Sequence, residues 1–208
     1  DLVFTPLDKE IYPRPQRMFV EVGSQGDLLC GGSRAGHFRG VATVVLKLLN
    51  IVQPDRAYFG EKDFQQLVIL QQMAEEFNLP TQIISVETQR ESNGLAISSR
   101  NSYLNPRERE AASVLYKALQ MARQEITSGH GDLESARRAV LRALHMESAA
   151  KVEYVEIVDP VNLKSVESIS GLVRILVAVW IGDVRLIDNI VCTPPSMFAP
   201  PHQEDDCQ

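Results

Sequence analysis

The segment Arg56-Ala57-Tyr58-Phe59-Gly60-Glu61-Lys62-Asp63-Phe64-Gln65-Gln66 joins a short apolar strand to the start of a helix. A glycine at such a junction allows a close backbone turn, and the first turn of the helix presents unpaired N–H groups with a favourable dipole. Lys62 adds a full positive charge at the same place. The segment therefore predicts a phosphate site. A capped, solvent-exposed junction has a similar composition, so this alternative stays open.

The residues around this junction alternate between helix and strand patterns. Apolar residues recur at helical spacing over residues 39–52 and again over residues 67–77, and short apolar strands are expected at residues 56–59 and 82–86. Such alternation is typical of a parallel sheet with helices on its faces, as in a Rossmann-like domain. Ligands of these folds bind at the carboxyl ends of the strands, where Gly60 lies.

A different pattern follows Glu87. Asn105-Pro106-Arg107-Glu108 is a strong helix start, and it predicts one helix that runs to about Ser128 before Gly129. A second helix is expected from residue 133 to about residue 145. Three strands are expected at residues 152–158, 173–181 and 185–191, the last two joined by a hairpin at Gly182-Asp183. This part reads as a small α+β domain with a three-stranded antiparallel sheet.

Three regions follow from these patterns. Residues 1–88 are expected to form a Rossmann-like domain with a parallel sheet, residues 89–193 the small α+β domain, and residues 194–208 a disordered tail rich in proline and acidic residues.

The amino-acid composition limits the classes of binding partner that we expect. The chain has 208 residues, 21 Lys and Arg against 27 Asp and Glu, and a net charge of −6, which argues against nucleic acid or an anionic membrane as partner. The hydrophobic fraction of 44% is enough for a packed core. Three scattered cysteines, Cys30, Cys192 and Cys207, are too few for a disulfide framework or a zinc site, so we expect reduced thiols, no metal site and a cytoplasmic location.

Two further polar motifs accompany the junction. They are Ser33-Arg34-Ala35-Gly36-His37-Phe38-Arg39-Gly40, directly before an amphipathic helix, and Ile97-Ser98-Ser99-Arg100-Asn101, in a loop. Positive residues of an otherwise acidic chain gather in these motifs, as expected for a protein that binds small anions. Neither a Walker loop nor a Gly-x-Gly-x-x-Gly fingerprint is present in the sequence.

Taken in order, these motifs and Leu186-Ile187-Asp188-Asn189 closely resemble the pantoate–β-alanine ligase (pantothenate synthetase) family, and the resemblance extends from Asp1 to about Cys192. It implies an enzyme that uses ATP with magnesium to convert pantoate to pantoyl adenylate, and then transfers the pantoyl group to β-alanine. It also implies a homodimer. By the same resemblance, residues 1–88 would be the carboxyl-terminal half of a Rossmann-like ATP- and pantoate-binding domain, and residues 89–193 would close over the active site.

The resemblance also implies the site residues. Gly60, Glu61, Lys62 and Asp63 would bind ATP, and Gln66 would bind pantoate. Gln89, Ile97, Ser98, Ser99 and Arg100 would form the opposite wall of the ATP site. The catalytic residues would be Lys62, His37, Arg34 and Arg100.

Other readings of single residues stay open. His37 is also compatible with a structural histidine, and Lys62 with a surface lysine. Asp188 and Asn189 are expected to serve the fold, and Trp180 is expected in the core or at an interface.

The chain also departs from the family. Family members begin with a segment that is absent here and carries a His-x-Gly-His motif for the ATP phosphates; Gly129-His130-Gly131 is the nearest string, and it reads as a helix stop. The chain starts at Asp1, without Met. We therefore expect a fragment that is inactive by itself. Two alternatives remain: a related adenylate-forming nucleotidyltransferase, and an inactive nucleotide-binding or dimerising module.

Overall fold

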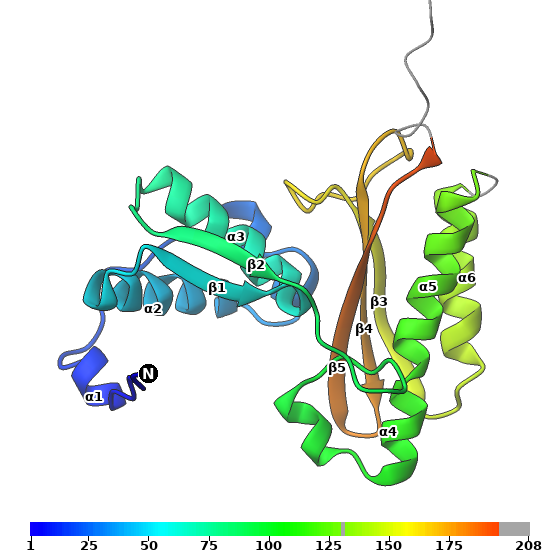
Figure 1. Cartoon of the computed structure of the whole chain (residues 1–208), viewed down its shortest axis with the longest axis horizontal. Coiled ribbons are helices and arrows are strands. Elements are labelled where there is room, and N and C mark those ends of the chain that lie inside the picture. The colour runs from blue at the N-terminus through cyan, green and yellow to red at the C-terminus, as the bar shows by residue number, and fades with distance from the viewer. Residues whose placement is uncertain (130–131, 196–208) are drawn as a thin grey trace, which may run out of the picture. The chain divides into compact units, whose positions relative to one another are not determined.

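The computed structural model describes residues 1–129 and 132–195 of the chain. It divides into two compact units, Asp1–Val86 and Glu87–Gln208. The first contains a two-stranded parallel sheet and the second a three-stranded antiparallel sheet (Figure 1), which confirms the predicted fold class.

The parallel sheet of the first unit consists of β1 (Arg56–Gly60) and β2 (Gln82–Val86), whose register runs from Arg56 opposite Gln82 to Gly60 opposite Val86. Helix α2 (His37–Val52) precedes β1, and helix α3 (Phe64–Glu76) connects the two strands. The helix-strand-helix-strand prediction is therefore confirmed.

Helix α3 supplies much of the core of this unit. Its buried apolar residues are Phe64, Leu67, Val68, Ile69, Leu70 and Met73. The turn between strand and helix is a 3-10 turn over Glu61–Asp63. A short helix α1 (Asp8–Ile11) and two 3-10 turns, Gly23–Gly26 and Leu29–Gly31, come before α2.

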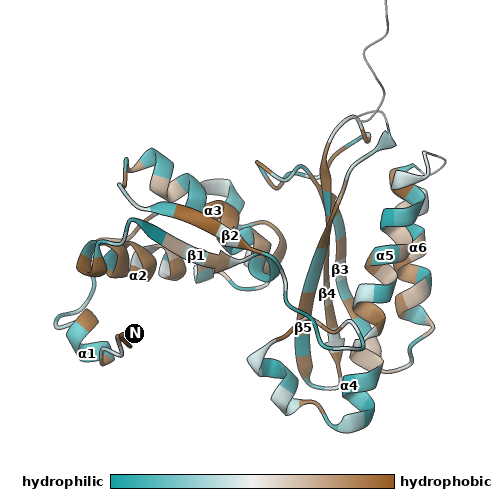
Figure 2. Ribbon diagram, viewed as in Figure 1, coloured by the Kyte–Doolittle hydropathy of each residue, from teal (hydrophilic) through white to brown (hydrophobic). Residues whose placement is uncertain are grey.

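The second unit packs helices against one face of its sheet. The strands β3 (Ala150–Val158), β4 (Val173–Ile181) and β5 (Val184–Cys192) are antiparallel in the order β3-β4-β5, and Ile181 pairs with Val184 across the predicted hairpin. Helices α5 (Val114–Thr127) and α6 (Leu133–His145) bury Leu119, Ile126 and Val140 with Ile175 and Val177 of β4. Figure 2 shows hydrophobic residues along these elements, whereas α4 (Pro106–Ala112) is largely hydrophilic.

The single helix predicted from Pro106 to about Ser128 is wrong, because the structure has two helices that meet at Ser113. The Ser113 N–H donates to the Glu110 carbonyl at 3.1 Å, three residues back, and Ser113 is only 2% exposed. A local three-residue hydrogen bond of this kind tightens the chain and interrupts the four-residue ladder. The predicted start of α4 is confirmed, since Asn105 and Glu108 form a reciprocal capping box.

Two predictions fall wholly or partly outside the described residues. Of the tail over residues 194–208 that we expect to be disordered, residues 196–208 lie outside the described residues. His130 and Gly131 lie outside them as well. Gly129 is described and has a φ of +73° directly after α5, as expected of a helix stop. None of the helices in the described part of the chain is long and apolar enough to cross a membrane.

Candidate functional site

The junction after β1 leaves open space at the end of the strand. Gly60 has φ −71° and ψ 133°, a conformation that any residue adopts, so the backbone at this position does not use the conformational freedom of glycine. A Cβ atom at Gly60 would meet no described atom within 4 Å outside its two neighbouring residues. Gly60 therefore leaves open space at the carboxyl end of β1.

The turn that follows carries the charged residues of the candidate site. Glu61 and Lys62 are half-buried, and Asp63 is exposed. Asp63 stands at the N-cap position of α3, yet its side chain makes no capping hydrogen bond. The Asp63 carboxylate therefore stays exposed next to Lys62 at the start of the helix.

Two adjacent glutamines at the start of α3 have different surroundings. Gln65 is 4% exposed: its Oε1 accepts from the Cys30 N–H at 3.1 Å, and its Nε2 donates to the carbonyls of Gln25 at 2.9 Å and Leu28 at 2.8 Å. Gln66 is half-buried. Gln65 therefore ties the beginning of α3 to the segment 25–30 that precedes the Arg34 turn.

Sequence reasoning missed this role of Gln65. A helical spacing of three and four residues places Gln65 on the same face as Val68 and Ile69, both of which are buried. That periodicity was the available signal.

Arg34 and His37 lie together in the turn that begins α2. The His37 N–H donates to the Arg34 carbonyl at 3.0 Å, and Gly36 between them has a φ of +73°, which favours glycine. Arg34 is exposed and His37 half-buried. Arg39 is engaged elsewhere, since it pairs with Glu21 at 2.8 Å and lies over the Phe19 ring at 3.9 Å.

The remaining predicted residues belong to the second unit, where they share one hairpin-like loop. The Ile97 N–H donates to the Gln89 carbonyl at 2.9 Å, so these two residues lie directly opposite each other. Ser98 caps the 3-10 turn Ser99–Tyr103, and its Oγ accepts from the Arg100 N–H at 3.3 Å. Ile97 and Ser99 are exposed, whereas Ser98 and Arg100 are half-buried.

The predicted residues are thus divided between the two units. The first unit holds Arg34, His37, Gly60, Glu61, Lys62, Asp63 and Gln66. The second unit holds Gln89, Ile97, Ser98, Ser99 and Arg100.

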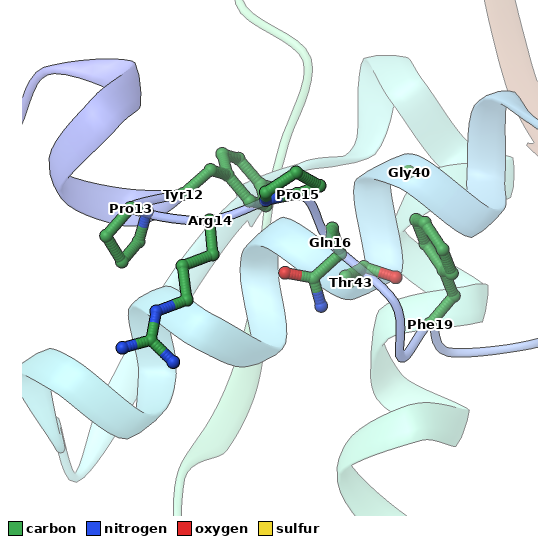
Figure 3. Close-up of a pocket in the computed structure, with 8 residues that line it drawn as sticks. All are labelled: Tyr12, Pro13, Arg14, Pro15, Gln16, Phe19, Gly40 and Thr43. Carbon is green, nitrogen blue, oxygen red and sulfur yellow. The ribbon is translucent and has the colours of Figure 1, made fainter.

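A pocket of about 470 Å³ lies elsewhere in the first unit (Figure 3). It is formed between the segment from Tyr12 to Phe19 and helix α2, which contributes Gly40 and Thr43. None of the predicted site residues lines this pocket, so sequence reasoning did not anticipate it.

The described residues contain no group of three or more His, Cys, Asp and Glu side chains able to hold a metal ion. Cys30 and Cys192 are free and buried, and burial raises the pKa of the Cys192 thiol to about 12, so this thiol stays protonated at neutral pH.

Comparison with known proteins agrees with the motifs. The model of the pantoate-beta-alanine ligase family matches residues 1–191. The pantothenate synthetase of Moorella thermoacetica is 46% identical over 191 residues, and that of Heliobacterium modesticaldum is 48% identical over the same length. Each match covers 92% of this chain and 68% of the relative, so the chain spans about two thirds of the length of these relatives.

Solved structures give the same result. A crystal structure of pantothenate synthetase from Thermus thermophilus is 42% identical, with a TM-score of 0.87 over 91% of this chain and 69% of that chain. The ligase of Francisella tularensis, complexed with beta-gamma ATP and beta-alanine, is 35% identical, with a TM-score of 0.66 over 88% of this chain and 62% of that chain. From the family match and these relatives, the chain belongs to the pantoate–β-alanine ligase family.

Proposed function

We propose that this chain carries most of the active site of a pantothenate synthetase, which condenses pantoate with β-alanine at the expense of ATP. One observation carries the proposal. The end of β1 has open space at Gly60, and the half-buried Lys62 and the start of α3 come directly after it. A positive charge beside free space is what a phosphate group needs, and the start of a helix adds a favourable dipole.

The reaction needs alignment and charge neutralisation rather than a protein nucleophile. The pantoate carboxylate attacks the α-phosphorus of ATP, and pyrophosphate leaves. The β-alanine amine then attacks the acyl carbon of the adenylate, loses a proton and displaces AMP. Fixed cations near the phosphates stabilise the charge that develops in the first step, and orientation of the two reactants lowers the barrier of both steps.

Each predicted residue has a role in this scheme. Lys62 and Arg100 neutralise the phosphates and the departing pyrophosphate, and Arg34 and His37 lie at the reacting centre. Gly60, Glu61, Asp63, Gln89, Ile97, Ser98 and Ser99 contact ATP, and Gln66 binds pantoate. The ATP role is supported by the Francisella relative, which was crystallised with beta-gamma ATP.

Magnesium enters this proposal as the companion of ATP. Mg²⁺ in such sites takes most of its ligands from phosphates and water and only one or two from carboxylates. Asp63 fits that requirement, because its exposed carboxylate caps nothing and stands next to Lys62. The ion would neutralise phosphate charge together with Lys62. A homodimer and a cytoplasmic location stay predictions.

The test is Lys62→Ala in a chain extended at its amino end with the preceding segment of the Thermus thermophilus relative. We expect ATP–pyrophosphate exchange dependent on pantoate to fall about a hundredfold or more, because one charge-assisted contact made in the transition state is lost. The melting temperature should stay nearly unchanged, since Lys62 is half-buried at a helix start.

Lys117→Ala is the matched control, because Lys117 is exposed on α5. If ATP–pyrophosphate exchange is unchanged in Lys62→Ala, Lys62 is only a surface lysine. Exchange that needs an acid other than pantoate would favour a related nucleotidyltransferase.

A further inference from the structure

The loop that carries Ser98, Ser99 and Arg100 is closed at its base by residues outside the predicted site. The Asn101 Nδ2 donates to Glu91 Oε1 at 2.9 Å and to the Ala96 carbonyl at 3.1 Å. Asn101 is 4% exposed. Glu91 and Asn101 thus join the two ends of the segment 92–100 through a partly buried contact.

Arg109 of α4 holds the same carboxylate from outside the loop. Its Nε donates to Glu91 Oε2 at 2.9 Å and its Nη2 to Glu91 Oε1 at 2.7 Å. The Arg109 guanidinium lowers the pKa of Glu91, with a smaller contribution from Asn101. Glu91 is therefore ionised at neutral pH and is fixed from two sides.

The neighbouring residue, Arg90, anchors the loop to the sheet. Its Nη1 and Nη2 donate to the two carboxylate oxygens of Asp188 at 2.6 and 3.0 Å, and Nη1 also donates to the Gly94 carbonyl at 3.1 Å. The guanidinium lies 3.6 Å from the centre of the Tyr116 ring. The Asp188 side chain is only 2% exposed, so this bidentate pair is well shielded from water.

The backbone of the loop is also held closely. Gly94 has a φ of +93°, and a Cβ at this position would lie 2.9 Å from the Tyr116 ring. Fixing the residues of a free loop costs conformational entropy. A loop that is already held does not incur this cost when a ligand binds, so it binds more tightly.

We propose that Glu91, Asn101 and Arg109, together with the Arg90–Asp188 pair, are positioning residues that hold Ser98, Ser99 and Arg100 in the shape that receives the phosphates of ATP. This inference rests on the proposed function. Asp188 therefore acts on the reaction through Arg90 and the loop, in addition to its role in the fold.

The test is Glu91→Gln in the extended chain, which removes the charge and keeps the volume of the side chain. We expect the KM for ATP to rise about tenfold while the KM for pantoate changes less than about twofold, because only the loop is released. Amide hydrogen exchange over residues 92–101 should become faster. Asp188→Asn should act in the same direction.

Glu153→Gln is the matched control. Glu153 accepts from Arg185 in the same bidentate way, at 2.8 and 2.9 Å, and its side chain is 22% exposed against 20% for Glu91. It also accepts from Trp180, which alternation along β4 places on the face of the sheet away from the helices. This variant should leave the ATP KM and the loop exchange unchanged.

A double variant tests whether Glu91 and Arg109 act as a unit. Glu91→Gln combined with Arg109→Met should raise the ATP KM no more than the more severe single variant, because both break one contact. The proposal is overturned if Glu91→Gln lowers the melting temperature but changes neither the hydrogen exchange of the loop nor the ATP KM. It is also overturned if Glu153→Gln raises the ATP KM and speeds the loop exchange as much as Glu91→Gln does. If the unmutated extended chain forms no pantothenate, the proposed function fails, and the exchange measurement still decides whether these contacts hold the loop.

Discussion

Two neighbouring glutamines show how closely structural and functional roles can stand in one sequence. Gln65 makes three buried hydrogen bonds to the segment 25–30, and Gln66, one residue on, is half-buried on a different side of α3. A step of one residue turns a helix by about 100°. The same side-chain type is therefore assigned to the fold at one position and is proposed for pantoate at the next.

Substitution of these glutamines separates the two roles. In the extended chain, Gln66→Ala should raise the KM for pantoate and leave the affinity for ATP nearly unchanged, because an amide that pairs with a substrate hydroxyl or carboxylate is lost. Gln65→Ala should lower the free energy of unfolding by about 2 kcal/mol or more, because backbone groups of the segment 25–30 lose their buried partner.

Separate measurements of the two KM values and urea unfolding decide the matter. Equal losses for pantoate and ATP in Gln66→Ala would indicate a local folding defect. No loss for pantoate would remove Gln66 from the site.

At the scale of elements, helix α4 connects a local capping motif to the candidate site. Asn105 Oδ1 accepts from the Glu108 N–H, and Glu108 Oε2 accepts from the Asn105 N–H, both at 2.9 Å. The helix is only seven residues long, and it carries Arg109, which holds Glu91. A helix this short depends on its cap and its tertiary contacts.

Asn105→Ala should therefore lower the free energy of unfolding by about 1 kcal/mol, the usual value of an N-cap side chain. It should also raise the ATP KM by a smaller factor than Glu91→Gln does, because Arg109 is loosened and not removed. Urea unfolding and steady-state kinetics measure the two effects. Asn105→Asp keeps an acceptor at the cap and should be nearly neutral in both.

At the scale of the whole molecule, the proposal depends on residues in two compact units. The sequence contains no His-x-Gly-His motif, which the family resemblance assigns to the grip on the ATP phosphates. We expect the 208 residues alone to form negligible pantothenate from ATP, pantoate, β-alanine and Mg²⁺, and the extended chain to be active. Product formation followed by mass spectrometry tests this, and robust turnover by the unextended chain would mean that the motifs present are sufficient.

Much of the fold was predictable because local spacing determines it. Helical periodicity predicted α2 and α3, short apolar runs predicted β1 and β2, and Gly182-Asp183 predicted the β4–β5 hairpin. The break at Ser113 was not predicted, because residues on both sides of it favour helix. The motifs likewise indicated which residues to propose for the site, since family resemblance is itself a property of the sequence.

What the sequence by itself determined about this protein is its family, its two kinds of sheet and the residues proposed for its site. Only the tertiary structure decided that Gly60 has an ordinary backbone, that Gln65 is structural, and that Arg90 pairs with Asp188 across 98 residues of chain. The physical reason is distance along the chain. Periodicity and capping reflect contacts within a turn or two, whereas an ion pair between a loop and β5 exists only after the strands have paired and brought the two charges together.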